Sequence, residues 1–572
     1  MWLLLVAAVA VTGAKAQQCE CISVGDIWSE NYHATFTATS TSSFTGFTID
    51  LTFSHDVDSL QVWTCEIISN DARHYTLQNK DFSASPGDEI TFEFMVHYVG
   101  PEPVIVEATL NGDDICGTGG YTTPAPYEDP CMPTGMTPYD YSQVLCMSFL
   151  FYEAQRSGPL PPDQRVTWRG ESAQDDGADV GHDLTGGYYD AGDHVKFGFP
   201  LAYTATVLSW GVLEYKDGYV QAGQLEYAYT AIRWVTDYLL KAHTNSYELY
   251  GQVGDGEADH AFWGRPEDMT MDRPAFKIDQ DHGGSDLAGE TAAALAAAYM
   301  VFKDSDPIYA EEMLVAARDL YEFADQVRVE YDVSIPEASA YYRSWSGYGD
   351  ELGWSACWLY YATGESIYLN DAKRHWNDFG MNKGDATGFS WDDKTAGVYL
   401  LMSQLDGGSE YLTTLQNFMD RIINDSPYTP GGLVYLDPWG SLRHANNVAF
   451  IALRAADLGL NPETYREFAK SQIDFTLGST GRSFVVGYGV NPPQRPHHRS
   501  SSCPDPPSDC SDGWAFSNPG PNPHVLYGAL VGGPDQNGQY EDDRGDFQRN
   551  EVACDYNAAF TGVLAAITQM NS

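Results

Sequence analysis

The chain is organised around the stretch Gly186-Gly187-Tyr188-Tyr189-Asp190-Ala191-Gly192-Asp193-His194-Val195-Lys196-Phe197-Gly198-Phe199-Pro200, which runs directly into an apolar segment with helical spacing from Leu201. Two carboxylates three residues apart can point at one small object such as a water molecule, and flanking glycines let the backbone approach a ligand closely. An acidic surface turn is the alternative, because Asp and Gly are ordinary turn residues. The neighbouring aromatic residues and Lys196 favour an active-site loop.

Size and charge restrict the class of protein. A chain of 572 residues should form two or more domains. Its 31 basic and 80 acidic residues give a net charge of −49, which repels phosphate backbones and anionic membrane surfaces, so neither nucleic acid nor a membrane is an expected partner. Aromatic residues make up 13% of the chain, which suits stacking on sugar rings, although large cores also use aromatic residues.

The N-terminal segment has the pattern of a secretory signal. Residues 1–16 contain an apolar run from Trp2 to Val11, followed by the small-residue site Ala14-Lys15-Ala16. No later stretch has about 18 uninterrupted apolar residues, the length that spans a membrane. We therefore expect a secreted, extracellular protein.

The cysteines are even in number, and an oxidising compartment favours their pairing. Cys503 and Cys510 bracket a short Pro-rich loop that a disulfide could staple. A bridge from Cys19 or Cys21 to Cys116 would join the ends of the first domain. Zinc binding is the less favoured alternative, because no Cys-x-x-Cys pair or His cluster accompanies them. The ten are Cys19, Cys21, Cys65, Cys116, Cys131, Cys146, Cys357, Cys503, Cys510 and Cys554.

Residues 17–116 show the period-two alternation of strands, separated by Ser, Asp, Gly and Pro turns. This pattern predicts a small all-β sandwich. The expected strands cover residues 32–40, 46–53, 59–68, 88–99 and 104–110.

This first domain resembles the family 2 carbohydrate-binding modules. It has cysteines near both ends, Trp28 before the first expected strand, Ser85-Pro86-Gly87 before a Phe-rich strand, and a closing Thr109-Leu110-Asn111-Gly112. The resemblance implies a flat face of aromatic side chains that stacks on polysaccharide, with Trp28, Trp63 and Phe82 as the candidates. Each of these aromatic residues could instead belong to the core.

Residues 117–137 are rich in Gly, Thr and Pro and read as a short linker, and residues 138–572 form the second domain. Twelve segments of this domain have helical spacing, which favours six helical hairpins. Small residues are densest at 291–298, where they allow the close packing of an inner ring. The long irregular stretches 158–200, 249–285 and 478–553 are expected to carry function. The helical segments are 141–157, 201–215, 224–242, 286–302, 309–327, 350–363, 366–379, 394–405, 410–424, 444–458, 463–477 and 556–570.

A second acidic and aromatic stretch, residues 540–558, places Glu551 just ahead of the last helix. Glycoside cleavage needs one carboxylic acid that protonates the departing oxygen and a second, ionised carboxylate. In the inverting case the second group activates a water, with a gap of roughly 6.5 to 9.5 Å between the two. Only a closed fold could bring Glu551 to Asp190 and Asp193.

Two motifs make this domain similar to glycoside hydrolase family 9 over nearly all of residues 139–567. The spacing of Asp542, Phe547, Glu551, Ala553 and Asn557 fits the C-terminal pattern of that family, and residues 483–499 fit its His-containing pattern. The resemblance implies an all-α (α/α)₆ barrel that hydrolyses internal β-1,4 bonds of cellulose with inversion.

The same resemblance assigns the catalytic roles. It makes Glu551 the general acid, Asp193 the general base and Asp190 the residue that helps hold the water. His497 contacts the substrate where the bond is cleaved. Asp542 is a further acid of the pattern or an ordinary loop residue. The adjacent His498 does not match the pattern, and we expect it to be structural.

Other residues that match the family are expected to bind substrate, although any of the aromatic ones could instead belong to the barrel core. Arg499 is expected at the subsite of cleavage. The remaining candidates are Trp439, Arg443, Tyr342, Trp345, His260, Trp263 and Tyr556.

The segment Ser344-Trp345-Ser346-Gly347-Tyr348-Gly349-Asp350-Glu351 resembles the structural calcium site of the family. Its ligands would be Ser346, Gly347, Asp350 and Glu351, with Asp392 as a further candidate. Oxygen-only ligands with two carboxylates suit Ca²⁺. Without the family, an Asp-Glu pair ahead of a helix is more often an N-terminal cap. The hydrolysis itself requires no cofactor.

The sequence therefore predicts a secreted endo-β-1,4-glucanase that acts as a monomer on cellulose or a related β-1,4-glucan. One alternative is a non-catalytic polysaccharide-binding protein that uses the barrel as a scaffold. Another is a processive or mixed-linkage β-glucanase.

Overall fold

The structure is a computed structural model that describes residues 22–114 and 131–571, apart from residues 29–30, 40–42, 54, 56, 71, 87, 99–102, 112, 507, 509 and 511–514. The chain divides into two compact units, Met1–Glu128 and Asp129–Ser572. The expected signal segment and most of the expected linker lie outside the described residues.

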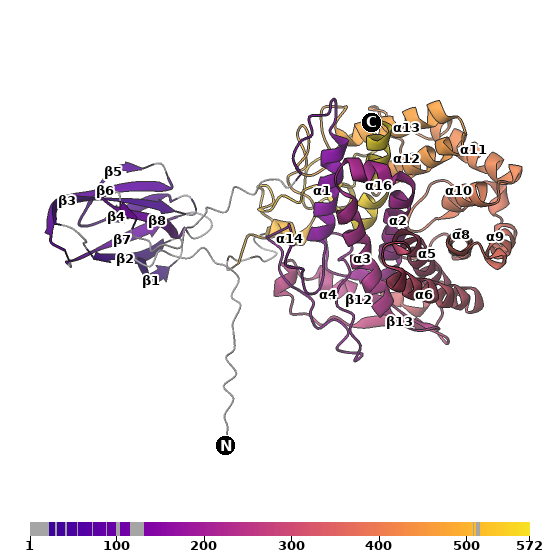
Figure 1. Cartoon of the computed structure of the whole chain (residues 1–572), viewed down its shortest axis with the longest axis horizontal. Coiled ribbons are helices and arrows are strands. Elements are labelled where there is room, and N and C mark those ends of the chain that lie inside the picture. Colours follow the sequence, from indigo (N-terminus) through magenta and orange to yellow (C-terminus); the bar gives the residue numbers. More distant parts are fainter. Residues whose placement is uncertain are drawn as a thin grey trace, which may run out of the picture. The chain divides into compact units, whose positions relative to one another are not determined.

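The N-terminal unit consists of two antiparallel sheets (Figure 1). Their inward-facing side chains, including Phe36, Ile49, Leu77 and Phe94, form one buried core. Alternate residues reach this core because side chains of a strand point to opposite faces in turn. In spatial order, one sheet contains β1 (Ile22–Trp28), β2 (Asn31–Thr39), β7 (Glu89–His97) and β4 (Ser59–Val62), and the other contains β5 (Glu66–Asn70), β6 (His74–Ala84), β3 (Phe44–Phe53), β8 (Ile105–Leu110) and β9 (Asp113–Asp114).

Two details of the predicted sandwich were wrong. The expected strand 59–68 is two strands in different sheets, because the chain bends between β4 and β5. β1 and β6 were not predicted, and Trp28 therefore ends a strand instead of preceding the first one. Among the described side chains of β6, Tyr75, Leu77 and the terminal Ala84 are buried, and the polar residues between them hide the alternation.

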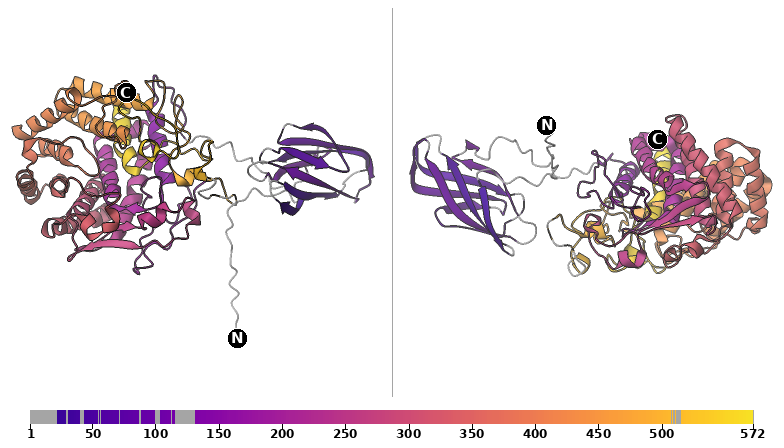
Figure 2. Two further views of the ribbon diagram at one scale, coloured as in Figure 1. Left: turned by 180° about the vertical axis from the view of Figure 1, so that it is seen from behind. Right: turned by 90° about the horizontal axis from the view of Figure 1, so that it is seen from below.

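The second unit is the predicted (α/α)₆ barrel (Figures 1 and 2). All twelve expected helices are present. The inner ring consists of α2 (Gly198–Gln221), α5 (Ser285–Phe302), α8 (Gly349–Thr363), α10 (Thr395–Leu405), α12 (Ser441–Asp457) and α16 (Cys554–Met570), each in contact with the next, and α16 closes the ring on α2. The outer helices are α1 (Tyr141–Ala154), α3 (Leu225–Ala242), α6 (Pro307–Gln326), α9 (Ser366–Asp378), α11 (Ser409–Asn424) and α13 (Pro462–Leu477).

Small residues allow the inner helices to approach closely. Every residue from Ala292 to Ala298 in α5 is fully buried, as expected for the inner ring. Gly218 of α2 meets α16, where a Cβ would lie 2.0 Å from the carbonyl oxygen of Ala565. Such contacts require glycine because any side chain would push the two helix backbones apart. α2 continues six residues beyond the predicted end, with a kink at Tyr215.

The long connections are more ordered than the sequence suggested. They contain a small antiparallel sheet and several short helices, which the lack of periodicity did not reveal. The sheet comprises β10 (Lys196–Phe197), β11 (His243–Asn245), β12 (Glu248–Val253) and β13 (Ala275–Asp279), and the helices are α4 (Gly256–His260), η1 (Pro266–Asp268), α7 (Tyr331–Ser334), η2 (Pro336–Ala338), η3 (Met381–Lys383), α14 (Arg499–Ser502) and α15 (Phe547–Asn550).

Disulfides join the expected pair Cys503–Cys510 and also Cys131–Cys146. Pairing of all cysteines is not observed, because Cys65, Cys357 and Cys554 are free thiols. Cys19, Cys21 and Cys116 lie outside the described residues.

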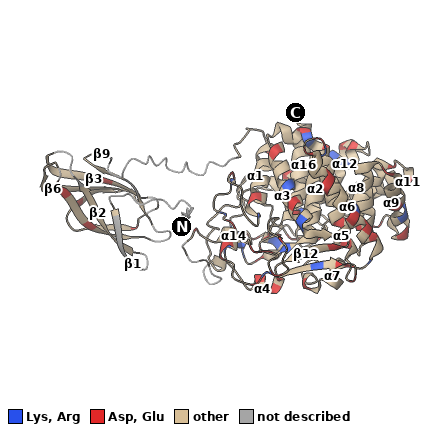
Figure 3. Ribbon diagram, turned by 60° about the horizontal axis from the view of Figure 1, so that its bottom comes forward, with Lys and Arg blue, Asp and Glu red and all other residues tan. Residues whose placement is uncertain are grey.

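Acidic residues are spread around the barrel, with fewer basic residues between them (Figure 3). Within the described part of the chain, no helix is both long and apolar enough to cross a membrane.

Candidate active site

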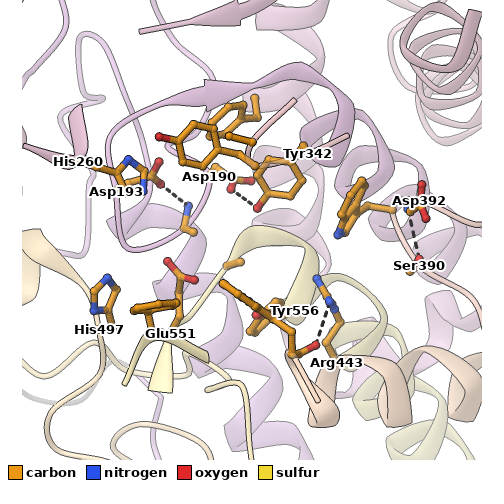
Figure 4. Close-up of a pocket in the computed structure, with 18 of the residues that line it drawn as sticks. Asp190, Asp193, His260, Tyr342, Ser390, Asp392, Arg443, His497, Glu551 and Tyr556 are labelled. Atoms are coloured by element: carbon orange, nitrogen blue, oxygen red, sulfur yellow. Dashed lines mark hydrogen bonds between the residues drawn. The ribbon is translucent and has the colours of Figure 1, made fainter. Parts of the chain in front are cut away.

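A cleft of about 650 Å³ lies in the barrel unit, and loops and helix ends from distant parts of the chain form its walls. Figure 4 shows acidic, aromatic and basic side chains pointing into this space. Twelve of the thirteen predicted catalytic and substrate-binding residues line it, namely Asp190, Asp193, Glu551, His497, Arg499, Trp439, Arg443, Tyr342, Trp345, His260, Trp263 and Tyr556.

Asp542 is the exception. Its carboxylate accepts hydrogen bonds from the backbone N–H groups of Gln494 (2.7 Å) and Arg495 (3.0 Å) and from the amide of Asn550 (3.2 Å). It is not among the residues that line the cleft. These contacts give it the role of a loop acid that fixes the chain ahead of His497.

The loop that carries Asp190 and Asp193 is fixed from both sides. The Asp190 N–H donates to the Val195 carbonyl at 3.0 Å, and the Asp190 carbonyl accepts from the N–H of Cys554, at the start of α16, at 2.9 Å. Gly192 lies so close to the chain at His497 that a Cβ there would lie 2.2 Å from the His497 carbonyl oxygen. The glycine is required by this close approach of two backbones.

Asp190 is almost fully buried, and the hydroxyl of Tyr342 donates to its Oδ2 atom. Burial and the nearby charge of Asp193 raise the pKa of Asp190 well above its ordinary value. Its Oδ1 atom is buried without a hydrogen-bond partner. Such an oxygen is available to a water or substrate hydroxyl in the cleft.

Glu551 connects α15 to α16, and the backbone around it is tied to the chain at His497. The N–H of His497 donates to the Asn550 carbonyl at 2.8 Å, and that of Gly532 donates to the Glu551 carbonyl at 2.9 Å. Burial and the negative charge of Asp193 raise the pKa of Glu551 to about 8. The side chain therefore keeps its proton at neutral pH, as a general acid must.

Asp193 and Glu551 point into the same cleft (Figure 4). Their charges interact, since Asp193 contributes to the raised pKa of Glu551. Asp193 accepts a hydrogen bond from the Ala191 N–H at 3.2 Å. Two residues that are 358 positions apart in the sequence are thus brought together by the closed ring of helices.

His497 and Arg499 both contact the ring of Trp263 in the cleft. The Nδ1 atom of His497 donates to the Arg544 carbonyl at 2.7 Å, and burial lowers the pKa of this histidine to about 4, so the ring is neutral. The Arg499 guanidinium lies over the Trp263 ring, 5.3 Å from its centre. His498 points away, contacts Gln155 at 2.8 Å and caps α14, as a structural residue would.

The aromatic candidates differ in exposure. Trp345 is 73% exposed and Trp439 is 42% exposed, so both present ring surface to solvent at the cleft. Trp263 is nearly buried and its indole N–H donates to Ser502 at 2.9 Å. Tyr556 lies beneath the guanidinium of Arg443 at 4.9 Å. Buried rings form the floor of the cleft, and the two exposed tryptophans are the better platforms.

Several lining residues were not predicted. Phe547 belongs to a motif that was recognised, but no role was given to it. The others were not singled out because nothing in the sequence distinguishes a side chain that lines a cleft from one that packs in a core, even for Phe197 in the acidic stretch and for His444 in an expected helix. They include Phe197, Tyr341, Trp391, Phe516, Asp437 and His444.

Oxygen atoms of the predicted calcium set converge in part. The Ser346 hydroxyl lies 2.7 Å from the Asp392 carbonyl oxygen, 3.3 Å from Asp350 Oδ1 and 3.4 Å from the Gly347 carbonyl oxygen. One hydroxyl proton cannot satisfy three acceptors, so a cation would fit this cluster. Glu351 is directed elsewhere, since its Oε1 atom pairs with the fully buried Lys394 at 2.9 Å.

A further charged group lies beside the cleft. Side-chain atoms of Asp193, Asp259 and His260 all come within 4.8 Å of one another. The Arg499 guanidinium is already 3.3 Å from Asp259, so the positive charge that this group needs comes from the protein. We assign no metal there.

The carbohydrate candidates of the N-terminal unit are placed differently. Trp63 is 60% exposed and its ring lies 5.9 Å from that of His33. Phe82 packs edge-on against the buried Phe47, so only part of its ring is available to a ligand. The side chain of Trp28 lies outside the described residues.

Known proteins resemble the barrel unit closely. A profile of glycosyl hydrolase family 9 matches residues 141–564. Endoglucanase A of Bacillus pumilus is 46% identical over 451 residues, which cover 76% of this chain and 67% of that protein.

Solved structures agree. The structure of an endoglucanase from the termite Nasutitermes takasagoensis has a TM-score of 0.75 and 56% identity, covering 76% of this chain and 100% of that one. Endoglucanase CelQ from Clostridium thermocellum, solved with cellobiose and cellotriose, has a TM-score of 0.68 and 39% identity over 76% of this chain and 71% of that one. Because the family match spans most of the barrel and these relatives share its fold, the chain belongs to glycosyl hydrolase family 9.

Proposed function

We propose that this glycoside hydrolase is a secreted endo-β-1,4-glucanase that cleaves cellulose or a related β-1,4-glucan with inversion. The observation that carries the proposal is the pairing of Asp193 with a protonated Glu551 in one aromatic cleft. An acid and a base on a shared cleft are the two groups that inverting hydrolysis requires. The complexes of CelQ with cellobiose and cellotriose support a β-1,4-glucan as the ligand of this fold.

Each carboxyl group has a defined task in the proposed reaction. Glu551 donates its proton to the glycosidic oxygen, so the leaving sugar departs as a neutral alcohol while the C–O bond breaks. Asp193 accepts a proton from the water whose oxygen bonds to the anomeric carbon from the opposite face. Asp190, held by Tyr342, presents its free Oδ1 atom to the same water.

The cleft favours a long, neutral ligand. Trp345 and Trp439 expose ring surface on which sugars can stack. Arg443, which lines the same cleft, is held by the buried Asp555 at 3.1 Å. We expect the chain of sugars to extend across these rings on one side of the reacting bond, and past Trp263 and His497 on the other.

Activity on carboxymethyl-cellulose tests the function directly. Wild type should release reducing ends, and Asp193→Asn and Glu551→Gln should each lose activity by at least about a thousandfold while remaining folded by circular dichroism. Asp281→Asn, an exposed loop acid outside the cleft, is the matched control and should keep full activity. An inactive wild type would instead support a non-catalytic polysaccharide-binding protein.

The stereochemistry and the mode of action have separate tests. Proton NMR of a cello-oligosaccharide digest should show the α anomer first, and an initial β anomer would exclude inversion. The ratio of soluble to insoluble reducing ends distinguishes endo action from processive action, and a mixed-linkage glucan tests the remaining alternative.

We further propose a structural Ca²⁺ bound by Ser346, Gly347, Asp350 and Asp392, with Glu351 held by Lys394. The ion would stabilise the segment that carries Trp345 and would take no part in the chemistry. Chelation with EGTA should lower the melting temperature, and added Ca²⁺ should restore it. No change in melting temperature in wild type would contradict the site, and Asp350→Asn should reduce the calcium response.

The N-terminal unit and the signal segment complete the proposal. We infer that residues 17–116 are a carbohydrate-binding module, supported by the exposed Trp63 on a compact sandwich. The apolar N-terminal run and the disulfides support secretion. Recovery of the mature protein, beginning near Gln17, from the medium of expressing cells would test export.

A further inference from the structure

Asp259 is a buried carboxylate next to the cleft that the sequence did not single out. It lies in the short helix α4, which Asp255 caps by accepting a hydrogen bond from the Ala258 N–H at 2.8 Å. Only 1% of Asp259 is exposed, and it does not line the cleft. A charged side chain in such a place needs partners that compensate its burial.

Those partners come from two separate walls of the site. Both Asp259 oxygens accept from the backbone N–H of His194, at 3.2 and 3.3 Å. Its Oδ2 atom is 3.3 Å from Nη1 of Arg499, whose own backbone N–H donates to the Gly192 carbonyl at 3.0 Å. Asp259 therefore holds together the loop with the base and the segment with Arg499.

Asp259 also forms a charge pair with the base. Side-chain atoms of Asp193, Asp259 and His260 lie within 4.8 Å of one another, and Figure 4 shows Asp193 beside His260. Burial and the charge of Asp193 raise the pKa of Asp259 to about 6. Two carboxylates this close repel each other when both are ionised.

Other charged and titratable groups face Asp259 from the elements around it. The Nδ1 atom of His194 is 3.9 Å away and that of His260 is 3.8 Å away. The positive charge of Arg499 compensates one of the two negative charges, which leaves the pair with a net negative charge when both are ionised. These groups are Asp193, His194, His260, Arg273, Tyr341 and Arg499.

We propose that Asp259 is a positioning residue that orients Arg499 and the His194 backbone around Asp193 and, through its negative charge, makes Asp193 a better proton acceptor for the attacking water. The inference rests on the proposed function, in which Asp193 is the base. A negative charge nearby favours the protonated form of a carboxylate, so the base that accepts the proton is stronger. The Asp259 carboxylate also holds the Arg499 guanidinium, which therefore stays directed at the cleft.

Asp259→Asn in the full chain tests the charge separately from the shape. The amide can still accept from the His194 N–H, but it carries no charge. On a soluble cello-oligosaccharide we expect kcat to fall about tenfold or more, with a smaller change in KM. The acidic limb of the kcat/KM profile should move to lower pH by about one unit, because the substitution removes the negative charge beside Asp193.

Asp255→Asn is the matched control, since it changes the cap of the same helix by the same substitution. Its acidic limb should coincide with that of wild type. A structural role for Asp259 would lower kcat without moving that limb, so an unmoved limb in Asp259→Asn overturns the inference.

Two further variants keep the test decisive. If Asp259→Asn does not fold, Asp259→Glu, which keeps the charge, must leave the acidic limb within about 0.3 units of wild type, and a larger shift overturns the inference. If Asp193→Asn retains wild-type activity, the proposed base is wrong. That result appears without any change at Asp259, so it separates a failure of the proposed function from a failure of the inference about Asp259.

Discussion

A Cβ atom on Gly192 would lie 2.2 Å from the carbonyl oxygen of His497. The two backbones meet at this point, between Asp190 and Asp193 on one side and the segment that leads to Arg499 on the other. A methyl group at position 192 would therefore push the loop that carries Asp193 away from the segment that contains His497.

Gly192→Ala should therefore reduce kcat more than it reduces stability. The added methyl displaces the loop, and a displacement of about 1 Å costs about a hundredfold in rate. Gly388→Ala is the control, because the nearest atom to its Cβ would be 4.0 Å away, and it should keep wild-type activity. Steady-state kinetics and thermal melting of both variants separate the two effects. A Gly192→Ala enzyme with normal kcat would show that the loop can shift without consequence.

Activity should decline as the solution becomes alkaline. Glu551 must be protonated to act as the acid, and its pKa is raised to about 8 by burial and Asp193. The kcat/KM of the free enzyme should be level just below that pH and then fall about tenfold per unit above it. A profile on a soluble cello-oligosaccharide measures this limb. A basic limb more than about two units lower would show that the acid is another group or that the site is more solvated.

Asp286, at the start of α5, should make the fold less stable at neutral than at acidic pH. It is fully buried, and burial raises its pKa to about 7. A carboxyl group whose pKa is raised on folding stabilises the fold when protonated, and this stabilisation is lost as the pH rises from the unfolded value to the folded one. The Asp286 contribution therefore declines between about pH 4 and pH 7.

Asp286→Asn tests this contribution. The amide oxygen can still accept from the N–H groups of Leu287 and Tyr331, as Oδ1 of Asp286 does. The melting temperature of the variant minus that of wild type should be a few degrees higher at pH 8 than at pH 5. Parallel melting curves for the two proteins would contradict the prediction.

Trp439 should contribute to substrate binding more than to folding. Its ring is 42% exposed at the cleft and contacts Phe547 with ring centres 5.5 Å apart. Trp439→Ala should raise KM for a cellohexaose substrate about fivefold, the equivalent of about 1 kcal/mol of stacking. Tyr428→Ala, an exposed aromatic residue that does not line the cleft, should leave KM unchanged. Equal KM values in all three proteins would exclude the platform.

Trp63 gives a separate test of the N-terminal unit. Trp63→Ala in the full chain should reduce retention on insoluble cellulose while kcat/KM on soluble carboxymethyl-cellulose stays at the wild-type value. Chitin beads in a parallel pull-down identify which polymer the unit prefers. Retention equal to wild type on both polymers would remove Trp63 from the binding face.

The sequence predicted the helices well because their apolar spacing repeats over many residues, and even the alanine-rich inner position of α5 was evident. It singled out Glu551 and Asp193, the proposed acid and base, because they occur in motifs, and both line the cleft. Asp259 could not be found in this way. Its partners His194 and Arg499 are 65 and 240 positions away, and nothing in the short helix α4 distinguishes the buried Asp259 from the exposed Glu257 two residues earlier.

The strands were predicted less reliably for a related reason. β6 is mostly polar, and β10 to β13 are short and pair across the long loops, so their partners are set by the fold and not by local pattern. For Asp542 the motif left two roles open, and its hydrogen bonds to the backbone N–H groups of Gln494 and Arg495 favour the loop acid.

Ring closure by α16 has a consequence for biosynthesis. Glu551 immediately precedes this helix, which packs on α2 from the beginning of the barrel. Because synthesis proceeds from the N-terminus, the proposed general acid is added only with the final inner helix, after the other eleven barrel helices. A polypeptide that ends before this helix thus lacks both the contact that closes the ring and the proposed proton donor.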